Sequence, residues 1–369
     1  MRPFAGFFRS AGGDVKVGQC VFMNDGPTER NIDGQRFLKS GFVETDTTKF
    51  DTSIFTKNEL FWTATNTGVD SQGLYVMAYN GTDRVCAGSA AGNIVTTTDG
   101  VTWSIRDGGF GSGGIIAMTY GNGLWVAGGL SGRIATSPDG LTWTQRTSGF
   151  GTSTIGALHQ AGNIFLAVGE GGKMGWSTDG ITWTVTTIPA FGSSAINSIW
   201  YDGTNYGWVA AGDDGKCAAA ADPIVGPWTP LNLGFGTTSI RAIRSNGAGL
   251  WVACGHEGKI GVRTANNDWR IVDGGFALDW CYAIAAGQDR FVICANNGKV
   301  AVSRDGFTWT QLQVGLGAFN LRTVVFCFGT KWLIGGNVNR ASLSQGLQPY
   351  AGSYLPALQG SAIQYMRIS

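Results

Sequence analysis

Ser177-Thr178-Asp179-Gly180-Ile181-Thr182-Trp183 is the stretch of sequence that decides the fold. The same pattern, [ST]-x-D-G-x-T-W, returns at residues 97–103, 137–143 and 303–309. Asp followed by Gly is typical of a tight turn, because the carboxylate accepts hydrogen bonds from turn amides and Gly adopts a positive φ. The Ser or Thr adds a local side-chain bond, and the Trp is expected to open the next strand and bury its ring. We therefore predict a structural role for Asp99, Asp139, Asp179, Asp305, Trp103, Trp143, Trp183 and Trp309.

Tryptophan recurs at a nearly constant interval, at positions 62, 103, 143, 183, 228, 269 and 309. Each interval of about 40 residues holds four short apolar runs, which is the pattern of a β-propeller blade. After Trp309 the chain supplies three further strands, and Leu60 to Ala64 looks like a fourth strand without its first three. Joining the two would close a ring and remove exposed sheet edges.

The sequence thus predicts an all-β fold, a seven-bladed β-propeller of four-stranded blades closed by an N-terminal strand in the last blade. No sustained helical period interrupts this pattern. The expected domains are an N-terminal docking arm at 1–55, the propeller at 56–346 and a C-terminal docking tail at 347–369.

The repeated turn resembles the Asp-box (BNR) repeat of sialidases and other β-propellers. The resemblance implies the fold and raises the possibility of a sialidase-like glycoside hydrolase. Sialidases carry an F-R-I-P motif that supplies one of three arginines for the substrate carboxylate, and no such motif is present here. Arg241 and Arg322 could take the place of two of these arginines, but nothing in the sequence places the remaining catalytic groups.

Composition narrows the function classes further. The chain has 59 glycines, 14% charged residues and a net charge of +1, which gives no bulk electrostatic case for nucleic acid. No apolar run approaches the roughly 20 residues of a membrane span, and Arg9 interrupts the N-terminal apolar residues that a signal peptide would need. The seven cysteines are unclustered and lie mostly in apolar runs, so we expect buried free thiols. No metal, no cofactor and no membrane insertion are expected.

The turns between the second and third strands repeat as G-x-x-G-[KR]. This spacing predicts a ring of cations at the start of the third strands, formed by Arg133, Lys173, Lys216, Lys259, Lys299 and Arg340. One interpretation is that these residues are exposed hairpin positions whose cations pair with acids of neighbouring blades. The other is a polar funnel that binds a sugar or an acidic group.

The second residue of each innermost strand should lie on the same face as these turns. In blades five to seven this position holds Arg241, Tyr282 and Arg322. Arg suits bidentate recognition of carboxylates, and Tyr suits stacking on a sugar ring. The candidate ligand-binding residues are Arg241, Tyr282, Arg322, His256, Asn296, Glu170, Asp213, Lys216 and Lys259.

The segments joining one blade to the next repeat as well, with Phe150, Phe191 and Phe235 each followed by Gly. We expect these rings to fill the seams between blades, with a stacking platform for a ligand as the alternative.

Catalysis is not predicted. Glu170 and Asp213 lie on consecutive blades and could form the acid pair of a hydrolase, but their loops are short hairpins. The two histidines, His159 and His256, fall on different blades, which argues against a catalytic triad. A binding or structural protein is therefore the favoured class.

The ends of the chain carry a second resemblance. Residues 36–41 and 44–46, and the closing residues 364–368, are similar to segments of tail and fibre proteins of tailed bacteriophages. The resemblance implies a virion component, made in the host cytoplasm, whose propeller binds the host surface or a glycan. Residues 1–55 and 347–369 would then attach it to other virion subunits. An intracellular assembly or scaffold factor with an Asp-box propeller is the alternative.

Overall fold

The computed structural model describes residues 62–69, 73–203, 206–263 and 268–344, together with short strands near both ends of the chain. The chain divides into two units, one formed by Trp62–Gln345 and the other by Met1–Phe61 with Gly346–Ser369.

The strands of the second unit pair in four small antiparallel sheets. They are β1 (Phe4–Gly6) with β4 (Val21–Met23), β2 (Arg9–Ala11) with β3 (Asp14–Lys16), β5 (Glu29–Ile32) with β6 (Gln35–Leu38) and β7 (Val43–Glu44), and β36 (Tyr354–Gln359) with β37 (Ala362–Arg367). The remaining residues of the predicted arm and tail lie outside the described residues.

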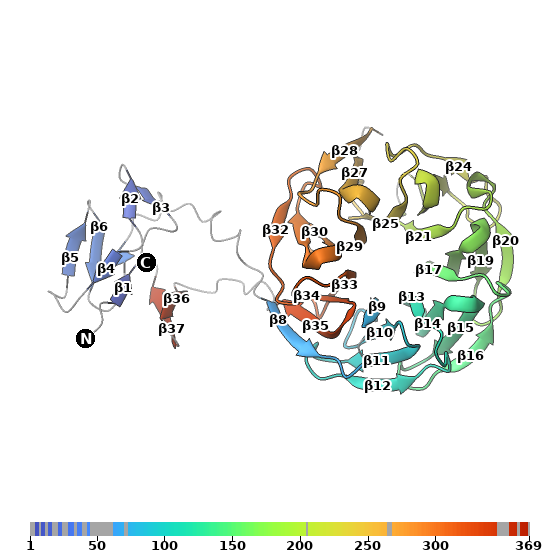
Figure 1. Cartoon of the computed structure of the whole chain (residues 1–369), viewed down its shortest axis with the longest axis horizontal. Coiled ribbons are helices and arrows are strands. Elements are labelled where there is room, and N and C mark those ends of the chain that lie inside the picture. The colour runs from blue at the N-terminus through green and yellow to red at the C-terminus, as the bar shows by residue number, and fades with distance from the viewer. Residues whose placement is uncertain are drawn as a thin grey trace. The chain divides into compact units, whose positions relative to one another are not determined.

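Seven four-stranded antiparallel sheets form a ring in the first unit (Figure 1). Blade 1 consists of β9 (Leu74–Tyr79), β10 (Val85–Ser89), β11 (Asn93–Thr97) and β12 (Ser104–Asp107). Blade 2 consists of β13 (Ile115–Gly121), β14 (Leu124–Gly129), β15 (Arg133–Ser137) and β16 (Thr144–Thr147). Blade 3 consists of β17 (Ile155–Ala161), β18 (Ile164–Gly169), β19 (Lys173–Ser177) and β20 (Thr184–Thr187).

The remaining blades repeat this order. Blade 4 consists of β21 (Ile196–Tyr201), β22 (Trp208–Gly212), β23 (Cys217–Ala220) and β24 (Thr229–Pro230). Blade 5 consists of β25 (Ile240–Ser245), β26 (Trp251–Gly255), β27 (Lys259–Arg263) and β28 (Trp269–Asp273). Blade 6 consists of β29 (Cys281–Gly287), β30 (Arg290–Ala295), β31 (Val300–Ser303) and β32 (Thr310–Leu312). Blade 7 consists of β33 (Leu321–Cys327), β34 (Lys331–Gly336), β35 (Val338–Ser344) and the N-terminal β8 (Trp62–Asn66).

Strand β8 closes the ring, as the sequence predicted. It pairs antiparallel with β35 in a register that places Trp62 opposite Ser344 and Asn66 opposite Arg340. The two strands are separated by most of the chain, so this pairing joins the first and last elements of the propeller. Strand β8 supplies the outer strand of blade 7, so that β35 is covered and blade 7 has four strands like the other six.

The repeated Asp-Gly turns have the predicted hydrogen bonds. Asp179 Oδ1 accepts from the amides of Ile181 and Thr182, both at 2.8 Å, and from Ser177 Oγ, also at 2.8 Å. Gly180 has a φ of +72° and donates its amide to Ser177 Oγ at 2.8 Å. The Trp183 indole donates to the Gly180 carbonyl at 3.1 Å, so its ring closes the turn. The fourth strand begins one residue beyond this Trp, at Thr184, rather than at the Trp itself as expected from the sequence.

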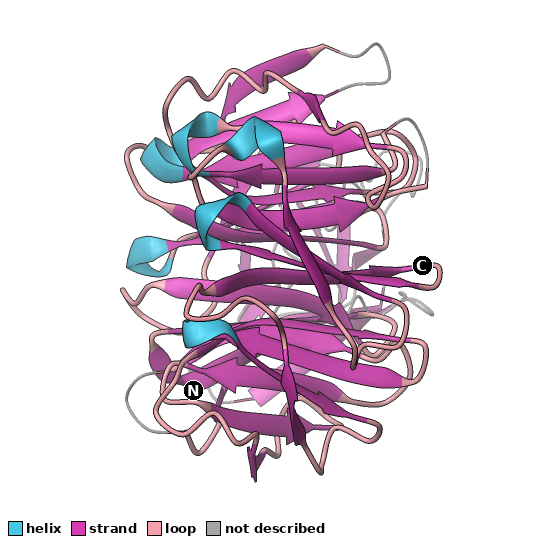
Figure 2. Ribbon diagram, turned by 90° about the vertical axis from the view of Figure 1, so that its right-hand side faces the viewer, coloured by secondary structure: helices cyan, strands magenta, loops and turns pink. Residues whose placement is uncertain are grey.

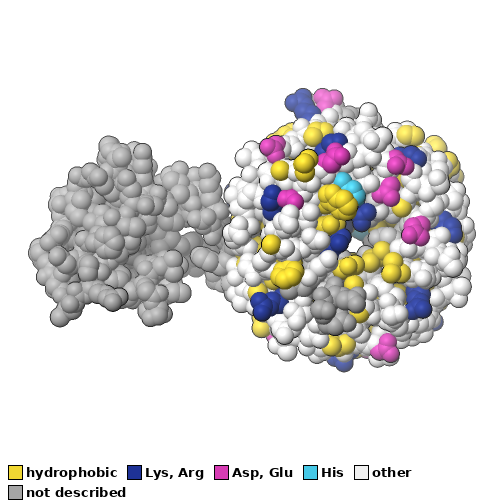
Figure 3. Space-filling view, viewed as in Figure 1, with side chains coloured by type: hydrophobic (Ala, Val, Ile, Leu, Met, Phe, Trp, Pro, Cys, Tyr) yellow, Lys and Arg dark blue, Asp and Glu magenta, His cyan; other side chains and the backbone are white. Residues whose placement is uncertain are grey.

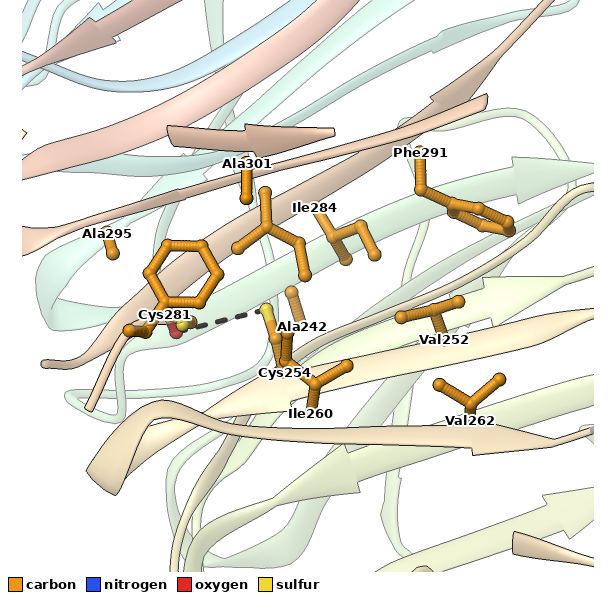
Figure 4. Close-up of a cluster of buried hydrophobic side chains, with 12 residues drawn as sticks. Ala242, Val252, Cys254, Ile260, Val262, Cys281, Ile284, Phe291, Ala295 and Ala301 are labelled. Atoms are coloured by element: carbon orange, nitrogen blue, oxygen red, sulfur yellow. Dashed lines mark hydrogen bonds between the residues drawn. The ribbon is translucent and has the colours of Figure 1, made fainter. Parts of the chain in front are cut away.

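The seams between blades hold the core. Phe110, Phe150, Phe191, Phe235 and Phe276, each in a segment that enters a blade, are at most 1% exposed. This confirms the expected filling of the seams. Figure 4 shows the seam between blades 5 and 6, where side chains of the two sheets face each other.

The cysteines take part in this packing. Cys86, Cys217, Cys254, Cys281, Cys294 and Cys327 are free and buried. Burial raises the pKa of Cys254 to about 12, so its thiol stays neutral. These six residues behave as the small buried hydrophobes that the sequence predicted.

The topology gives the ring two unlike faces. The turns between second and third strands form 3-10 turns at η3 (Leu130–Gly132), η4 (Glu170–Gly172), η6 (Asp213–Gly215), η7 (His256–Gly258) and η8 (Asn296–Gly298), and η5 (Pro189–Phe191) lies in a blade-joining segment. Figure 2 shows these turns gathered at one edge of the ring, which we name the 3-10 face. The Asp-Gly turns join third and fourth strands and therefore lie on the opposite face. No helix in the described part of the chain is long and apolar enough to cross a membrane.

Candidate ligand-binding site

The cations at the start of the third strands hold the blade-joining segments in place. Five of the six predicted cations donate to the carbonyl of the buried Phe that precedes their own blade, and in the described propeller the sixth, the exposed Arg340, does not. The pairs are Arg133 with Phe110, Lys173 with Phe150 at 2.9 Å, Lys216 with Phe191 at 2.9 Å, Lys259 with Phe235 at 3.3 Å and Lys299 with Phe276 at 3.4 Å.

This geometry corrects the expected pairing of these cations with acids of neighbouring blades. The shared partner is a main-chain carbonyl. The acids that join it lie in the same turn, as with Glu257 at 3.0 Å from Lys259, or in the segment that enters the blade, as with Asp279 at 2.6 Å from Lys299. Lys216 also donates to Ser194 Oγ at 2.8 Å, and Lys259 donates to Thr238 Oγ1 at 2.6 Å. Two predicted ligand-binding residues, Lys216 and Lys259, are thus engaged in holding the loops.

Three of the predicted polar residues in the 3-10 turns also form hydrogen bonds within the propeller. Glu170 Oε2 accepts from the Thr154 amide at 2.9 Å, and Asn296 Oδ1 accepts from the Trp280 amide at 2.9 Å. Asp213 Oδ1 accepts from the Asn197 side-chain amide at 2.8 Å. Glu170 and Asn296 therefore fix the start of an inner strand, which is a positioning role.

The mouth cluster, defined as Arg241, Tyr282 and Arg322, comes together as predicted. The guanidinium carbon of Arg322 lies 3.9 Å from the ring centroid of Tyr282 and 5.3 Å from that of Tyr75. Burial lowers the pKa of Arg241, the charge of Asp213 raises it again, and the charge of Arg322 lowers it further. Arg241 and Arg322 therefore sit close enough to repel each other.

A bulge explains why these side chains meet. In every blade the ladder between the first and second strands slips by one residue at the second position of the inner strand, as between Ile240 and Ala242. The extra residue is left outside the regular ladder, and a bulge redirects its side chain. Arg241, Tyr282 and Arg322 all occupy this position.

Trp280 adds an aromatic surface beside the mouth cluster. Its ring is stacked on His256 with the centroids 3.9 Å apart and the planes 15° apart, and it lies 6.3 Å from the Tyr282 ring. Trp280 is 45% exposed and the nearby Leu278 is 80% exposed. Burial and the charge of Arg241 lower the pKa of His256, so its ring is neutral at pH 7.

Trp280 is not among the residues predicted from the sequence, although its position carries a signal. The carbonyl of Trp280 accepts from the amide that opens the next 3-10 turn. In the other six blades, the residues whose carbonyl accepts from the turn between second and third strands are Gly73, Gly114, Thr154, Ala195, Ser239 and Asn320. Trp280 is the one large aromatic residue among them, and alignment of the blade-joining segments would have shown this.

A second group, which we name the inner stack, lies three residues further along the inner strands. The His159 ring centroid is 4.2 Å from that of Trp200, and the guanidinium carbon of Arg244 is 4.5 Å from the Trp200 ring. Arg244 Nη1 donates to the Ile243 carbonyl at 2.7 Å and to Ser198 Oγ at 3.3 Å. Burial lowers the pKa of Arg244 to about 10, and burial with the Arg244 charge lowers that of His159 to about 3.

The 3-10 face therefore presents aromatic rings and arginines around the centre of the ring. Figure 3 shows dark blue and cyan side chains there, next to a group of yellow ones. Aromatic faces bind flat apolar surfaces such as those of sugars, and guanidinium groups bind oxyanions. In the described part of the chain, no group of three His, Cys, Asp or Glu residues could hold a metal ion.

The comparisons with known proteins show the fold. No protein-family model and no curated protein matches the sequence. The structure is similar to virginiamycin B lyase from Staphylococcus aureus, with a TM-score of 0.70 and 12% identity over 78% of this chain and 99% of that chain. It is similar to YCF48 from Cyanidioschyzon merolae, with a TM-score of 0.60 and 17% identity over 77% of this chain and 98% of that chain.

A third solved structure, the WD40 β-propeller domain of Doa1, has a TM-score of 0.62 and 14% identity over 79% of this chain and 99% of that chain. These neighbours include one enzyme, and at such identities the likeness establishes the architecture alone. The chain is a seven-bladed β-propeller of four-stranded antiparallel blades.

Proposed function

We propose that this protein is a tail or fibre component of a bacteriophage virion whose propeller binds a carbohydrate of the host surface on its 3-10 face. The observation that carries the binding role is Trp280, an exposed ring backed by His256. A ring held at this exposure offers an apolar face to a sugar at low entropic cost, because His256 already fixes its orientation. The mouth cluster next to it supplies hydrogen-bond donors for the polar edge of the ligand.

The role in a virion rests on the two ends of the chain. Residues 36–41, 44–46 and 364–368 are similar to segments of phage tail and fibre proteins. Under this proposal residues 1–55 and 347–369 bind neighbouring subunits, and the 3-10 face is the surface that binds the host. The 3-10 face binds and the Asp-Gly face supports the ring.

The hydrogen bonds of the two candidate acids favour binding over hydrolysis. Glu170 and Asp213, the candidate acid pair, are engaged by the Thr154 amide and the Asn197 side chain. A general acid of a glycosidase must be free to donate a proton to the oxygen of the leaving group. We therefore propose recognition, and not hydrolysis, as the chemistry of this face.

A peptide-binding assembly factor is the second candidate. One structural neighbour is a YCF48 bound to a D1 peptide, with a TM-score of 0.63 and 15% identity over 77% of this chain and 94% of that chain. The same face of this propeller would accept a peptide if its exposed side chains, Leu278 and Trp280, served as anchors.

Binding of the full-length protein to host envelopes and isolated surface glycans tests the proposal. We expect saturable binding that Trp280→Ala weakens at least tenfold, about 1.4 kcal/mol. The matched control is Phe307→Ala, because Phe307 is a 37% exposed aromatic residue on the Asp-Gly face. Binding of peptides but of no glycan would favour the assembly factor, and turnover of a glycoside would favour the hydrolase. Loss of binding in Phe307→Ala and not in Trp280→Ala would contradict the assigned face.

A further inference from the structure

The innermost strands of the seven blades carry a charge of one sign. Strands β9, β13, β17, β21, β25, β29 and β33 contain three arginines, Arg241, Arg244 and Arg322, and no Asp or Glu. These strands surround the centre of the ring (Figure 1). With a net charge of only +1 over the whole chain, such an excess of positive charge at the centre is a local feature.

The three arginines lack the partners that other cations of the propeller have. Five cations of the ring at the third strands, all but Arg340, donate to a Phe carbonyl, and three of the five also meet an acid. Among the residues that the structure describes, no carboxylate forms an ion pair with Arg241, Arg244 or Arg322. Arg322 donates to Asn337 Oδ1 at 3.2 Å, and none of the hydrogen bonds in the described chain uses the Arg241 guanidinium.

Of the three, Arg244 is the arginine whose charge most lacks a counter-charge. Its side chain is half-buried and packs on Trp200, and its two acceptors are a hydroxyl and a carbonyl, which are neutral. A partly buried charge without a counter-charge is unfavourable, because the cost of its partial desolvation is not offset by an opposite charge. The same holds in part for Arg241, which has the charge of Asp213 nearby but no ion pair with it.

The two arginines of β25 lie three residues apart, about 10 Å along a strand. Arg241 belongs to the mouth cluster, with Arg322 facing it from blade 7, and Arg244 belongs to the inner stack. An oxyanion at the centre of the ring would meet cations from blades 5 and 7 at the mouth and a further cation below. Guanidinium groups suit this use, because their donors match the geometry of carboxylate and phosphate oxygens.

We propose that the centre of the ring is a binding site for an oxyanionic group, carboxylate or phosphate, held by Arg241, Arg322 and Arg244. The group arrives either as a free anion or as the acidic substituent of a larger ligand on the 3-10 face. The inference goes beyond the carbohydrate platform at Trp280, and it stands whether or not that platform binds a glycan.

Calorimetric titration of the full-length protein tests the site. The probes are inorganic phosphate, and glucuronate compared with glucose, each at an ionic strength held constant with sodium chloride. We expect one saturable site for phosphate or glucuronate, none for glucose, and a rise of the melting temperature with the bound anion. Binding of phosphate identifies a free-anion site, and binding of glucuronate alone identifies an acidic substituent.

Variants separate this site from general attraction to a positive surface. Arg241→Gln and Arg244→Gln should each weaken anion binding at least tenfold and remove most of the rise in melting temperature. Arg270→Gln removes the same charge from an exposed position on β28 and should leave both readouts unchanged. If Arg244→Gln impairs folding, the same measurements are made on Arg322→Gln and Arg241→Gln, which should weaken anion binding.

Three results would overturn the proposal. The first is the absence of saturable binding of phosphate and of glucuronate at constant ionic strength. The second is an equal loss of binding in Arg270→Gln, which would indicate non-specific attraction. The third is a folded Arg244→Gln protein and a folded Arg241→Gln protein that both bind the anion as the parent does. If the protein binds phosphate but no glycan, the proposed function is wrong and the oxyanion site still stands.

Discussion

The Trp280 indole and the His256 imidazole lie face to face, 3.9 Å apart between centroids, although they belong to different blades. His256 opens the 3-10 turn of blade 5, and Trp280 ends the segment that enters blade 6. Each ring covers the other, so the pair joins two blades at the surface and keeps the histidine partly out of water. Its pKa is lowered mainly for this reason.

Removal of Trp280 should therefore change the titration of His256. In Trp280→Ala the imidazole gains water, and its pKa should rise toward the ordinary value of about 6.5. Nuclear magnetic resonance titration of the imidazole protons measures this, with Phe307→Ala as the control that leaves the pKa in place. An unchanged pKa in Trp280→Ala would show that the charge of Arg241, and not the stacked ring, dominates the shift.

The Asp-Gly turn predicts a loss of stability in acid. Hydrogen bonds from Thr182, Ile181 and Ser177 lower the pKa of Asp179 to about 2. Since the folded pKa lies below the unfolded value of about 3.9, the stabilisation is complete above that pH and is lost as the pH falls toward 2. Asp179→Ala should cost about 1–2 kcal/mol at pH 7 and leave ligand binding intact. Denaturant unfolding at pH 7 and pH 3 measures both effects, and loss of binding by the folded variant would contradict the structural role.

His159 predicts a second dependence on pH, in a higher range. Its imidazole is packed against Trp200 and Trp208, and its pKa is lowered to about 3. The unfolded chain binds a proton near pH 6.5 and the folded chain does not, so stability should fall as the pH drops from about 6.5 toward 3. In His159→Phe this fall should be smaller, as thermal unfolding at pH 7 and pH 5 would show. An identical fall in both proteins would mean that His159 is protonated in the folded state.

The buried Phe of the blade-joining segments predicts a large loss of stability. Phe235 is 1% exposed in the seam between blades 4 and 5, and its carbonyl accepts from Lys259. Phe235→Ala should destabilise the propeller by about 3–5 kcal/mol, because it leaves a cavity. Lys259→Met should cost about 1 kcal/mol, because it removes only the anchor of the loop. Denaturant unfolding of both variants checks the order, and a larger cost for Lys259→Met would reverse the assigned roles.

Local interactions made much of this fold readable. The Asp179 turn uses donors within three residues of the carboxylate, so its conformation is determined by residues that are adjacent in the sequence. The spacing of the tryptophans then counts the blades, and Trp62 without its own blade indicates closure by β8. Arg241, Tyr282 and Arg322 were also predicted together, because their common position in the strand places them at one level of the ring.

Other features depend on contacts between residues that lie far apart in the sequence. Lys216 and Lys259 look like free cations in the sequence, and only the folded loops show the Phe carbonyls that bind them. The meeting of Trp280 with His256 requires the rotation between two blades, and the stacking of Arg244 on Trp200 requires the curvature of the ring. The sequence by itself determined the turns, the blade count and the closing strand, because these follow from short-range hydrogen bonds and a fixed period. Tertiary structure alone decided which cations bind a carbonyl or an acid and which remain without a counter-charge, because these contacts depend on the distances between blades.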